Sequence, residues 1–318
     1  MRTYLDFEKP VAELEAKVQE LRDLAANGDA VAIEEEIARL EAKAHEALKD
    51  LYGKLTPWQK TQVARHPQRP HFSNYVSELV EDFTPLAGDR TYAEDPAILG
   101  GFGRFRGESV LILGHEKGSD TQSRIRHNFG MARPEGYRKA VRLMDLAERF
   151  SVPVISLVDT AGAYPGVGAE ERGQAEAIAR ATDRCLSLGV PNVTVIIGEG
   201  GSGGAIAIAT ANRVLMLEHA IYSVISPEGA ASILWHDPTR AQDAATALKM
   251  TAEDLKRVAV IDAVVTEPVG GAHRDPSATI TAVGEAIARA LTEIGNFDAQ
   301  EARRHRREKF LAMGRALS

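Results

Sequence analysis

The chain contains a single cysteine, Cys185, among its 318 residues. One cysteine can form neither an intrachain disulfide nor a cysteine-rich zinc site, and its apolar helical surroundings favour a small buried residue. Long apolar stretches are missing too: no run approaches the ~18 apolar residues of a membrane span. The first residues lack the apolar segment of a secretory signal. We therefore expect a cytoplasmic protein with no membrane contact and no metal of its own.

An excess of basic charge is also absent. The formal net charge is −7, and hydrophobic residues (44%) and charged residues (26%) occur in the proportions of an ordinary globular protein. Most of the acidic excess lies in the first 50 residues. Nothing in this balance indicates nucleic acid as a partner. The length allows one large domain with additional segments, or two modest domains.

Glycine, by contrast, is abundant between residues 198 and 204, in the segment GEGGSGG. The apolar run before it, Val193 to Ile197, is typical of a buried strand, and a short apolar helix is expected after it. Glycines let a ligand approach backbone N–H groups directly. The first N–H groups of a helix have no partner within the helix and lie at the positive end of its dipole. This segment therefore suits a negative charge on oxygen.

A dinucleotide-binding motif is one interpretation of these glycines. Gly198, Gly200 and Gly203 match G-x-G-x-x-G after a strand, and Glu218 follows at about the distance of a ribose contact. However, only about ten residues separate Gly203 from the next strand near Arg213, and a crossover helix with its loops needs ~12 or more. This spacing argues against a dinucleotide site.

Two other interpretations of the same segment stay open at this point. Ser202 lies in G-x-S-x-G, the sequence of a hydrolase nucleophile, and the possible bases downstream are His219, His236 and His273. Alternatively, Gly203 and Gly204 donate their backbone N–H groups to an oxyanion and Ser202 is merely small.

A second glycine-rich loop, residues 159–168, follows another buried apolar strand at 153–158. Both loops leave the carboxyl ends of strands, the edge at which α/β proteins bind ligands. Asp159, Tyr164 and Glu199 are the only side chains in the two loops that are suited to moving protons, and no histidine lies in either. A reaction that needs only stabilisation of an enolate or oxyanion therefore fits better than hydrolysis.

The chain is expected to have four parts: a helical hairpin over 1–52, a helical collar over 53–96, a core over 97–295 and a basic helical tail over 296–318. In the hairpin, Asn27-Gly28 forms the turn and Asp29 caps the second helix. Further along we expect a helix capped by Thr56, a helix over 73–83, strands at 98–105 and 109–114, and a helix over 170–188. The sheet is expected to begin near Ile98. This order suits a coiled stack of ββα turns better than a flat doubly wound sheet.

A basic loop follows the strand at 109–114. Five cations lie within seventeen residues: Lys117, Arg124, Arg126, His127 and Arg133. Such a loop beside a sheet edge is either a solvated surface or a site for a phosphate or a partner protein.

Six segments together resemble the alpha subunits of bacterial acetyl-CoA carboxylase carboxyltransferase. They are RHPQRP at 65–70, NFGM at 128–131, PEGYRKA at 134–140, DTAGAYPGVGAEERG at 159–173, GEGGSGGA at 198–205 and SPEG at 226–229. The resemblance covers essentially the whole chain. It implies a crotonase-type (Clp-protease-like) fold of ββα turns.

The resemblance also implies an activity and partners. The expected reaction transfers the carboxyl group of carboxybiotin, attached to the biotin carboxyl carrier protein, to acetyl-CoA. The product is malonyl-CoA, and the reaction is the first committed step of fatty acid synthesis. Biotin carboxylase is expected to carboxylate the biotin of the carrier beforehand. The implied assembly is α2β2, with zinc in the beta subunit, and this chain is expected to be active only with that subunit.

Residue roles follow from the same resemblance. Gly203 and Gly204 are the expected N–H donors to carboxybiotin. Gly162, Ala163 and Tyr164 are expected to form the facing wall of the biotin pocket, and Ala205 to lie beside the substrate. Lys117 and Arg124 are candidates for contacts with coenzyme A phosphates or with the partner subunit.

Overall fold

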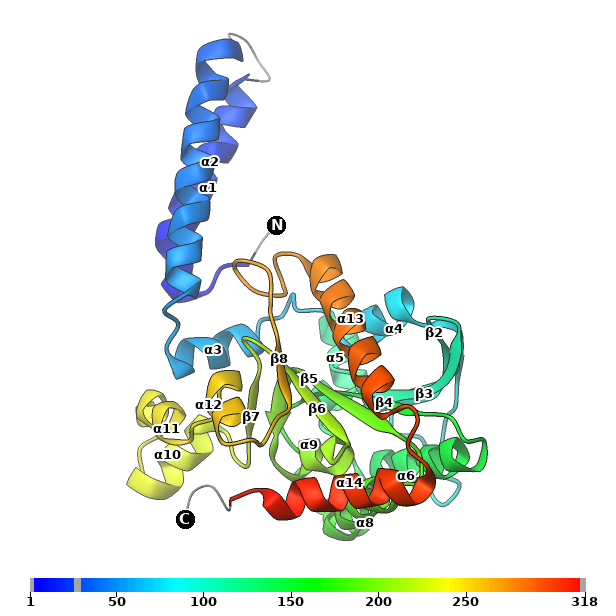
Figure 1. Ribbon diagram of the computed structural model, residues 1–318. Helices are drawn as coiled ribbons and strands as arrows, with labels where there is room; N and C mark the ends of the chain where they lie inside the picture. The colour runs from blue at the N-terminus through cyan, green and yellow to red at the C-terminus, as the bar shows by residue number, and fades with distance from the viewer. Residues whose placement is uncertain (1–2, 26–29, 315–318) are drawn as a thin grey trace.

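The computed structural model describes residues 3–25 and 30–314, and a single mixed sheet forms the centre of this part of the chain (Figure 1). The sheet order is β1-β2-β3-β4-β5-β6-β8, and β7 pairs with the far end of β5. Strands β1 to β3 are antiparallel, and the later pairs are parallel. The strands are β1 (Glu81–Pro85), β2 (Ile98–Phe105), β3 (Glu108–His115), β4 (Val154–Thr160), β5 (Asn192–Gly201), β6 (Arg213–Leu217), β7 (Ile221–Ser223) and β8 (Ala263–Val265).

Helices cover both faces of the sheet. On one side lie α6 (Pro134–Arg149), α8 (Gln174–Ser187), α9 (Ser202–Ala209) and α14 (Ala299–Ala312), and on the other lie α4 (Phe72–Leu79) and α13 (Pro276–Ile294) (Figure 1). Strands β4 and β5 are buried along their whole length, so they form the centre of the core. Shorter helices are α5 (Thr121–Arg126), α7 (Val167–Glu170), α10 (Pro227–Trp235), α11 (Ala241–Ala247) and α12 (Ala252–Arg257).

The predicted N-terminal hairpin is confirmed as a pair of helices, α1 (Lys9–Ala25) and α2 (Ala30–Tyr52), which projects away from the sheet (Figure 1). Its predicted turn, Asn27-Gly28, and cap, Asp29, lie outside the described residues. Helix α3 (Pro57–Ala64) begins where predicted, because the Thr56 side chain accepts a hydrogen bond from the Gln59 N–H and forms a capping box. The division of the chain into four parts stays a prediction.

Two predicted boundaries are wrong. The helix expected over 73–83 ends at Leu79, and the sheet begins at β1 rather than near Ile98. β1 is an exposed polar edge strand whose sequence lacks apolar alternation, and its pairing comes from the backbone of β2. The helix expected over 170–188 is also wrong in extent: α7 ends at Glu170, and α8 begins at Gln174, after Gly173, whose φ of 80° is a left-handed conformation.

The basic C-terminal helix α14 is attached to the body by Arg306, which is fully buried. Its guanidinium donates to the carbonyls of Leu186, Leu188 and Val190 and to the side-chain oxygens of Asn192 and Asn212, at 2.7–3.1 Å. Burial lowers the pKa of Arg306 to about 10, so it is still charged at neutral pH. One arginine therefore supplies hydrogen-bond donors to three carbonyls between α8 and β5.

Replacing Arg306 with methionine keeps the apolar stem but leaves these acceptors without their donors. We expect Arg306→Met to lower the free energy of unfolding by roughly 3 kcal/mol, measured by urea denaturation. Arg304→Met, at an exposed position of the same helix, is the matched control and is expected to change it by less than about 0.5 kcal/mol. Equal effects of the two substitutions would contradict a bonding role for Arg306.

Candidate functional site

The glycine-rich segment forms a sharp corner between β5 and α9. Strand β5 continues through Gly201, and α9 begins at the next residue, so the predicted glycine turn is wrong in extent. The change of direction occurs at Ser202, whose φ is 54°. The segment stays in the sheet because Gly200 pairs with Thr160 on β4, and residues 199–201 pair with β7. The structure thus uses these glycines for close pairing instead of for a loop.

The second glycine-rich loop lies directly against this corner, as the sequence predicts. A Cβ atom at Gly201 would clash with the carbonyl of Ala161, and one at Gly204 would lie 2.7 Å from the backbone nitrogen of Ala163. The two backbones can approach this closely because Gly201 and Gly204 carry no side chain. The loop is itself braced, because the Thr160 hydroxyl accepts from the Gly162 N–H and donates to the Gly162 carbonyl.

The predicted site residues differ in how much they reach the surface. Ser202, Gly203, Ala163 and Tyr164 are half-buried, while Gly204 and Gly162 are buried. Ala205 is fully buried, so its side chain packs in the core behind the corner. A ligand at this corner therefore meets the backbone of the first turn of α9, and a side-chain contact from Ala205 has no support.

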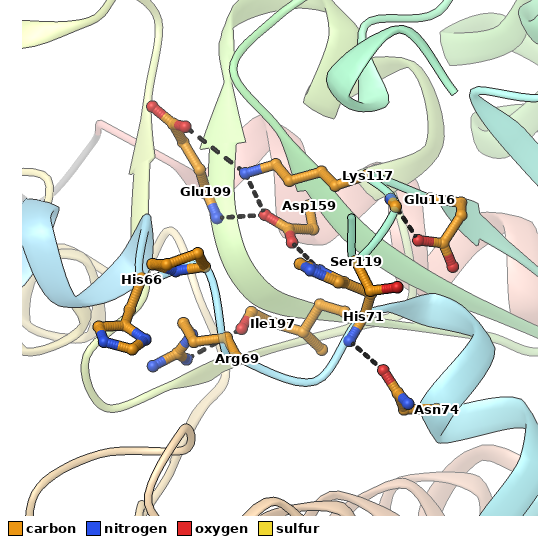
Figure 2. A network of polar contacts seen from close by, with 12 residues as sticks. His66, Arg69, His71, Asn74, Glu116, Lys117, Ser119, Asp159, Ile197 and Glu199 are labelled. Atoms are coloured by element: carbon orange, nitrogen blue, oxygen red, sulfur yellow. Dashed lines mark hydrogen bonds and ion pairs between the residues drawn. The ribbon is translucent and has the colours of Figure 1, made fainter. Parts of the chain in front are cut away.

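A charged network lies at the carboxyl ends of β4 and β5, around the carboxylate of Asp159 (Figure 2). Asp159 Oδ1 accepts from the backbone N–H of Glu199 at 2.9 Å and from Lys117 Nζ at 2.7 Å, and Oδ2 lies 3.5 Å from His71 Nδ1. Burial alone would raise the pKa of Asp159, but Lys117 and His71 hold it well below its ordinary value. This carboxylate is therefore a fixed charge that ties β4 to β5, and a poor proton acceptor.

Two arginines of the RHPQRP segment, which lies between α3 and α4, form hydrogen bonds with residues of β5. Arg65 Nε donates to Glu199 Oε1 at 2.9 Å, and Nη1 donates to Glu228 at 2.6 Å. Arg69 donates to the carbonyl of Ile197 and forms two hydrogen bonds of 2.8 Å with Glu267. Burial would raise the pKa of Glu267, but Arg69 lowers it to about 2. The strand that carries the glycine corner is thus held by charge-assisted bonds on this side.

A cavity of about 230 Å³ opens beside this network. Its lining combines the charged groups with small and apolar residues: Ala64, Arg65, His66, Pro67, His71, Lys117, Arg124, Phe129, Asp159, Ala161 and Glu199. Ala161 places it next to the second glycine-rich loop. Reasoning from the sequence missed the contribution of Arg65 and Arg69, because RHPQRP predicted only a helix end and a resemblance. It also missed His71, the residue that follows this segment. The unusual density of cations in that hexapeptide was the available signal.

The basic loop at 117–133 does not act as one surface. Lys117 is paired with Asp159 and lies 3.7 Å from Glu199, so a role in binding a free phosphate has no support. His127 bonds the carbonyl of Pro96. Arg124 donates to the carbonyls of Gly118 and Pro67 and has no carboxylate partner among the described residues.

The candidate hydrolase base was not found near Ser202. No hydrogen bond joins the Ser202 hydroxyl to another residue in the described part of the chain. His219 packs edge-on against Tyr52, with ring centroids 5.4 Å apart, and His273 stacks on His66 at 3.7 Å. His236 caps the carboxyl end of α10. All three histidines are thus engaged elsewhere.

Comparison with known proteins identifies close relatives. The model of the family "Acetyl co-enzyme A carboxylase carboxyltransferase-like" matches residues 4–314. The acetyl-coenzyme A carboxylase carboxyl transferase subunit alpha of Xanthobacter autotrophicus is 72% identical over 100% of both chains. That of Nitrobacter winogradskyi is 69% identical over 100% of this chain and 98% of its own.

Solved structures show the same fold at low identity. Transcarboxylase 12S, with methylmalonyl-coenzyme A and methylmalonic acid bound, is 20% identical with a TM-score of 0.58, over 71% of this chain and 41% of its own. The Pseudomonas malonate decarboxylase MdcD-MdcE heterodimer is 17% identical with a TM-score of 0.55, over 70% and 89%. The predicted crotonase-type α/β fold is therefore confirmed.

No group of three or more His, Cys, Asp or Glu side chains is arranged to hold a metal ion among residues 3–25 and 30–314. Over the same residues, no helix has the length and apolar character required to cross a membrane.

The Asp159 network can be tested through stability. Asp159→Asn keeps an acceptor for the Glu199 N–H but leaves the Lys117 ammonium without its partner. We expect the free energy of unfolding at pH 7 to fall by roughly 3 kcal/mol in urea denaturation. Because the pKa is lowered in the folded state, this contribution is fully present above the ordinary aspartate pKa and is lost as pH falls below it. The difference should therefore be constant between pH 5 and 8.

Asp120→Asn is the matched control, since Asp120 is an exposed N-cap at which asparagine is equally favourable. A stability loss at Asp159 no larger than at Asp120 would show that the buried network is not needed.

Proposed function

The chain belongs to the family of acetyl-CoA carboxylase carboxyltransferase alpha subunits, and from this membership we propose that the corner between β5 and α9 is its carboxybiotin site. The observation that carries the proposal is the contact between this corner and the second glycine-rich loop. The backbone of Gly162 and Ala163 packs against Gly204, so the first-turn amides of α9 lie beside a wall made of backbone atoms and the small side chain of Ala163. Such a slot suits the thin ureido ring of biotin.

The chemistry requires stabilisation of negative charge. When the bond between biotin N1 and the carboxyl carbon breaks, its electron pair builds charge on the ureido oxygen. The backbone N–H groups of Gly203 and Gly204 donate to that oxygen, and the α9 dipole adds to the effect. The biotin ureidoate then takes the α-proton of the acetyl thioester, and the enolate attacks the released carbon dioxide to give the malonyl thioester. Every proton transfer in this scheme proceeds without a side-chain base.

The charged network supports the site indirectly. The Asp159 carboxylate of β4 accepts from the Glu199 N–H of β5, and Arg65 and Arg69 form hydrogen bonds with β5 from the segment between α3 and α4. These bonds keep the two glycine-rich segments at a fixed separation. Preorganised donors are effective because they need no rearrangement during the reaction.

We further propose the partners and the location of the chain. The beta subunit supplies a zinc-binding domain and the donors for the acetyl thioester enolate, in an α2β2 assembly. The biotin carboxyl carrier protein presents carboxybiotin, which biotin carboxylase has formed. The product is malonyl-CoA for fatty acid synthesis in the cytoplasm. Arg124 is a candidate for contact with coenzyme A or the beta subunit.

A site shared between subunits predicts dependence on the partner. The purified chain alone is expected to form no malonyl-CoA from carboxybiotin and acetyl-CoA, and addition of the beta subunit is expected to restore transfer. The measurement is incorporation of radiolabelled carboxyl into malonyl-CoA. Substantial transfer by the isolated chain would contradict a shared site.

Gly204→Ala tests the corner directly. The added Cβ would lie 2.7 Å from the Ala163 nitrogen and force the two loops apart. Since loss of one oxyanion donor typically costs ~3 kcal/mol, we expect kcat of the assembled enzyme to fall about 100-fold, with assembly unchanged by gel filtration. Activity within threefold of the unmodified enzyme would count against this corner as the site.

A serine hydrolase is the alternative function, and the left-handed φ of Ser202 at a strand-to-helix corner favours it. Ser202→Ala, measured in the same transfer assay as Gly204→Ala, distinguishes a hydrolase from a carboxyltransferase. The carboxyltransferase proposal expects Ser202→Ala to keep most of the transfer activity and Ser202 to resist a fluorophosphonate. A folded and assembled but inactive variant, together with covalent labelling of Ser202, would favour the hydrolase.

A further inference from the structure

Arg133 lies beside the proposed site, and although its charge acts on the Asp95 carboxylate, no carboxylate of the described residues forms a hydrogen bond or ion pair with its guanidinium. Its guanidinium carbon lies 4.6 Å from the centroid of the Tyr164 ring, and the residue is half-buried. Among residues 3–25 and 30–314, no side chain or carbonyl forms a hydrogen bond or ion pair with this guanidinium. Its neighbours differ: Arg138 donates to Asp89 at 2.8 Å, and Arg172 is paired with Glu135. Of these three arginines, Arg133 alone has a guanidinium without a hydrogen-bond or ion-pair partner in the described part of the chain.

The backbone holds Arg133 and Tyr164 in place. The Arg133 N–H donates to Asp95 at 2.6 Å, and the Tyr164 N–H donates to the carbonyl of Ala132 at 3.0 Å. Gln174 Nε2 donates to the carbonyls of both Ala132 and Tyr164. An arginine stacked on an aromatic ring loses little freedom when it binds, and the N–H groups in its plane stay available. The pair is thus a prepared donor for an anion.

Its position links it to the proposed reaction. Tyr164 follows Gly162 by two residues, and the Gly162 backbone contacts Gly204 at the corner. A guanidinium presents two parallel N–H groups that match the two oxygens of a carboxylate or a phosphate. Both substrates of the proposed reaction carry such a group: the carboxylate of carboxybiotin and the phosphates of acetyl-CoA.

We propose that Arg133, supported by Tyr164, is the residue of this chain that binds the oxyanion group of a substrate at the mouth of the corner. This inference rests on the proposed function and adds a specificity-determining contact to it. The Tyr164 ring holds the guanidinium, and the guanidinium binds two oxygens of one ligand group.

The test uses the assembled enzyme with its beta subunit. Arg133→Gln removes the charge, and Arg133→Lys keeps the charge but loses the planar fork. Arg126→Gln is the matched control, at an exposed arginine of the same segment with no contact in the described chain. Steady-state transfer is measured with carboxybiotin free in solution and on its carrier, and with acetyl-CoA and acetyl-pantetheine, which lacks the phosphates of coenzyme A.

Arg133→Gln is expected to raise KM for one substrate at least tenfold, with kcat within threefold of the unmodified enzyme and the melting temperature unchanged. The KM of Arg133→Lys is expected to lie between those of the unmodified enzyme and Arg133→Gln. A higher KM for both forms of carboxybiotin assigns the carboxylate. A higher KM for acetyl-CoA but not for acetyl-pantetheine assigns a phosphate. Unchanged KM values, the same effect in Arg126→Gln, or an effect confined to carrier-bound carboxybiotin would overturn the inference. Absence of transfer by the unmodified enzyme would instead refute the proposed function.

Discussion

The close contact of two backbones at the β5–α9 corner is the constraint on which the rest of the site depends. Gly201 and Gly204 face the Ala161–Ala163 backbone at distances that leave no room for a Cβ atom. Such contact contributes little apolar burial of its own, so the surrounding structure has to maintain it. The bond from the Glu199 N–H to Asp159 and the hydroxyl of Thr160 do so from within the two strands. The helices behind the corner supply the apolar packing.

Charge at this edge of the sheet is arranged so that buried anions have cationic partners. Asp159 is matched by Lys117, Glu199 by Arg65, and Glu267 by Arg69. A buried carboxylate without such a partner would take up a proton or destabilise the fold. The network therefore keeps the carboxylates ionised and fixed, and leaves the helix terminus as the place where new negative charge is favoured.

Much of this arrangement could be predicted from local patterns. The capping box at Thr56, the antiparallel strands around Arg106-Gly107 and the position of the two glycine-rich segments at one sheet edge were all found where expected. The failures share a cause. β1 is a strand because its backbone pairs with β2. Glu199 to Gly201 stay in the sheet because Thr160 and β7 pair with them. Lys117 forms an ion pair with Asp159, a carboxylate more than forty residues away. Tertiary partners decide each of these, and no local pattern contains them.

The central claim is that unpaired amides of the first turn of α9 bind the ureido oxygen of biotin. A crystal structure of the assembled alpha and beta subunits with biotin bound would test it most directly. The account predicts that oxygen about 2.7–3.1 Å from the backbone nitrogen of Gly203 or Gly204, with the ring against Gly162 and Ala163. A biotin bound away from this corner, or with its ureido oxygen turned away from these amides, would contradict it.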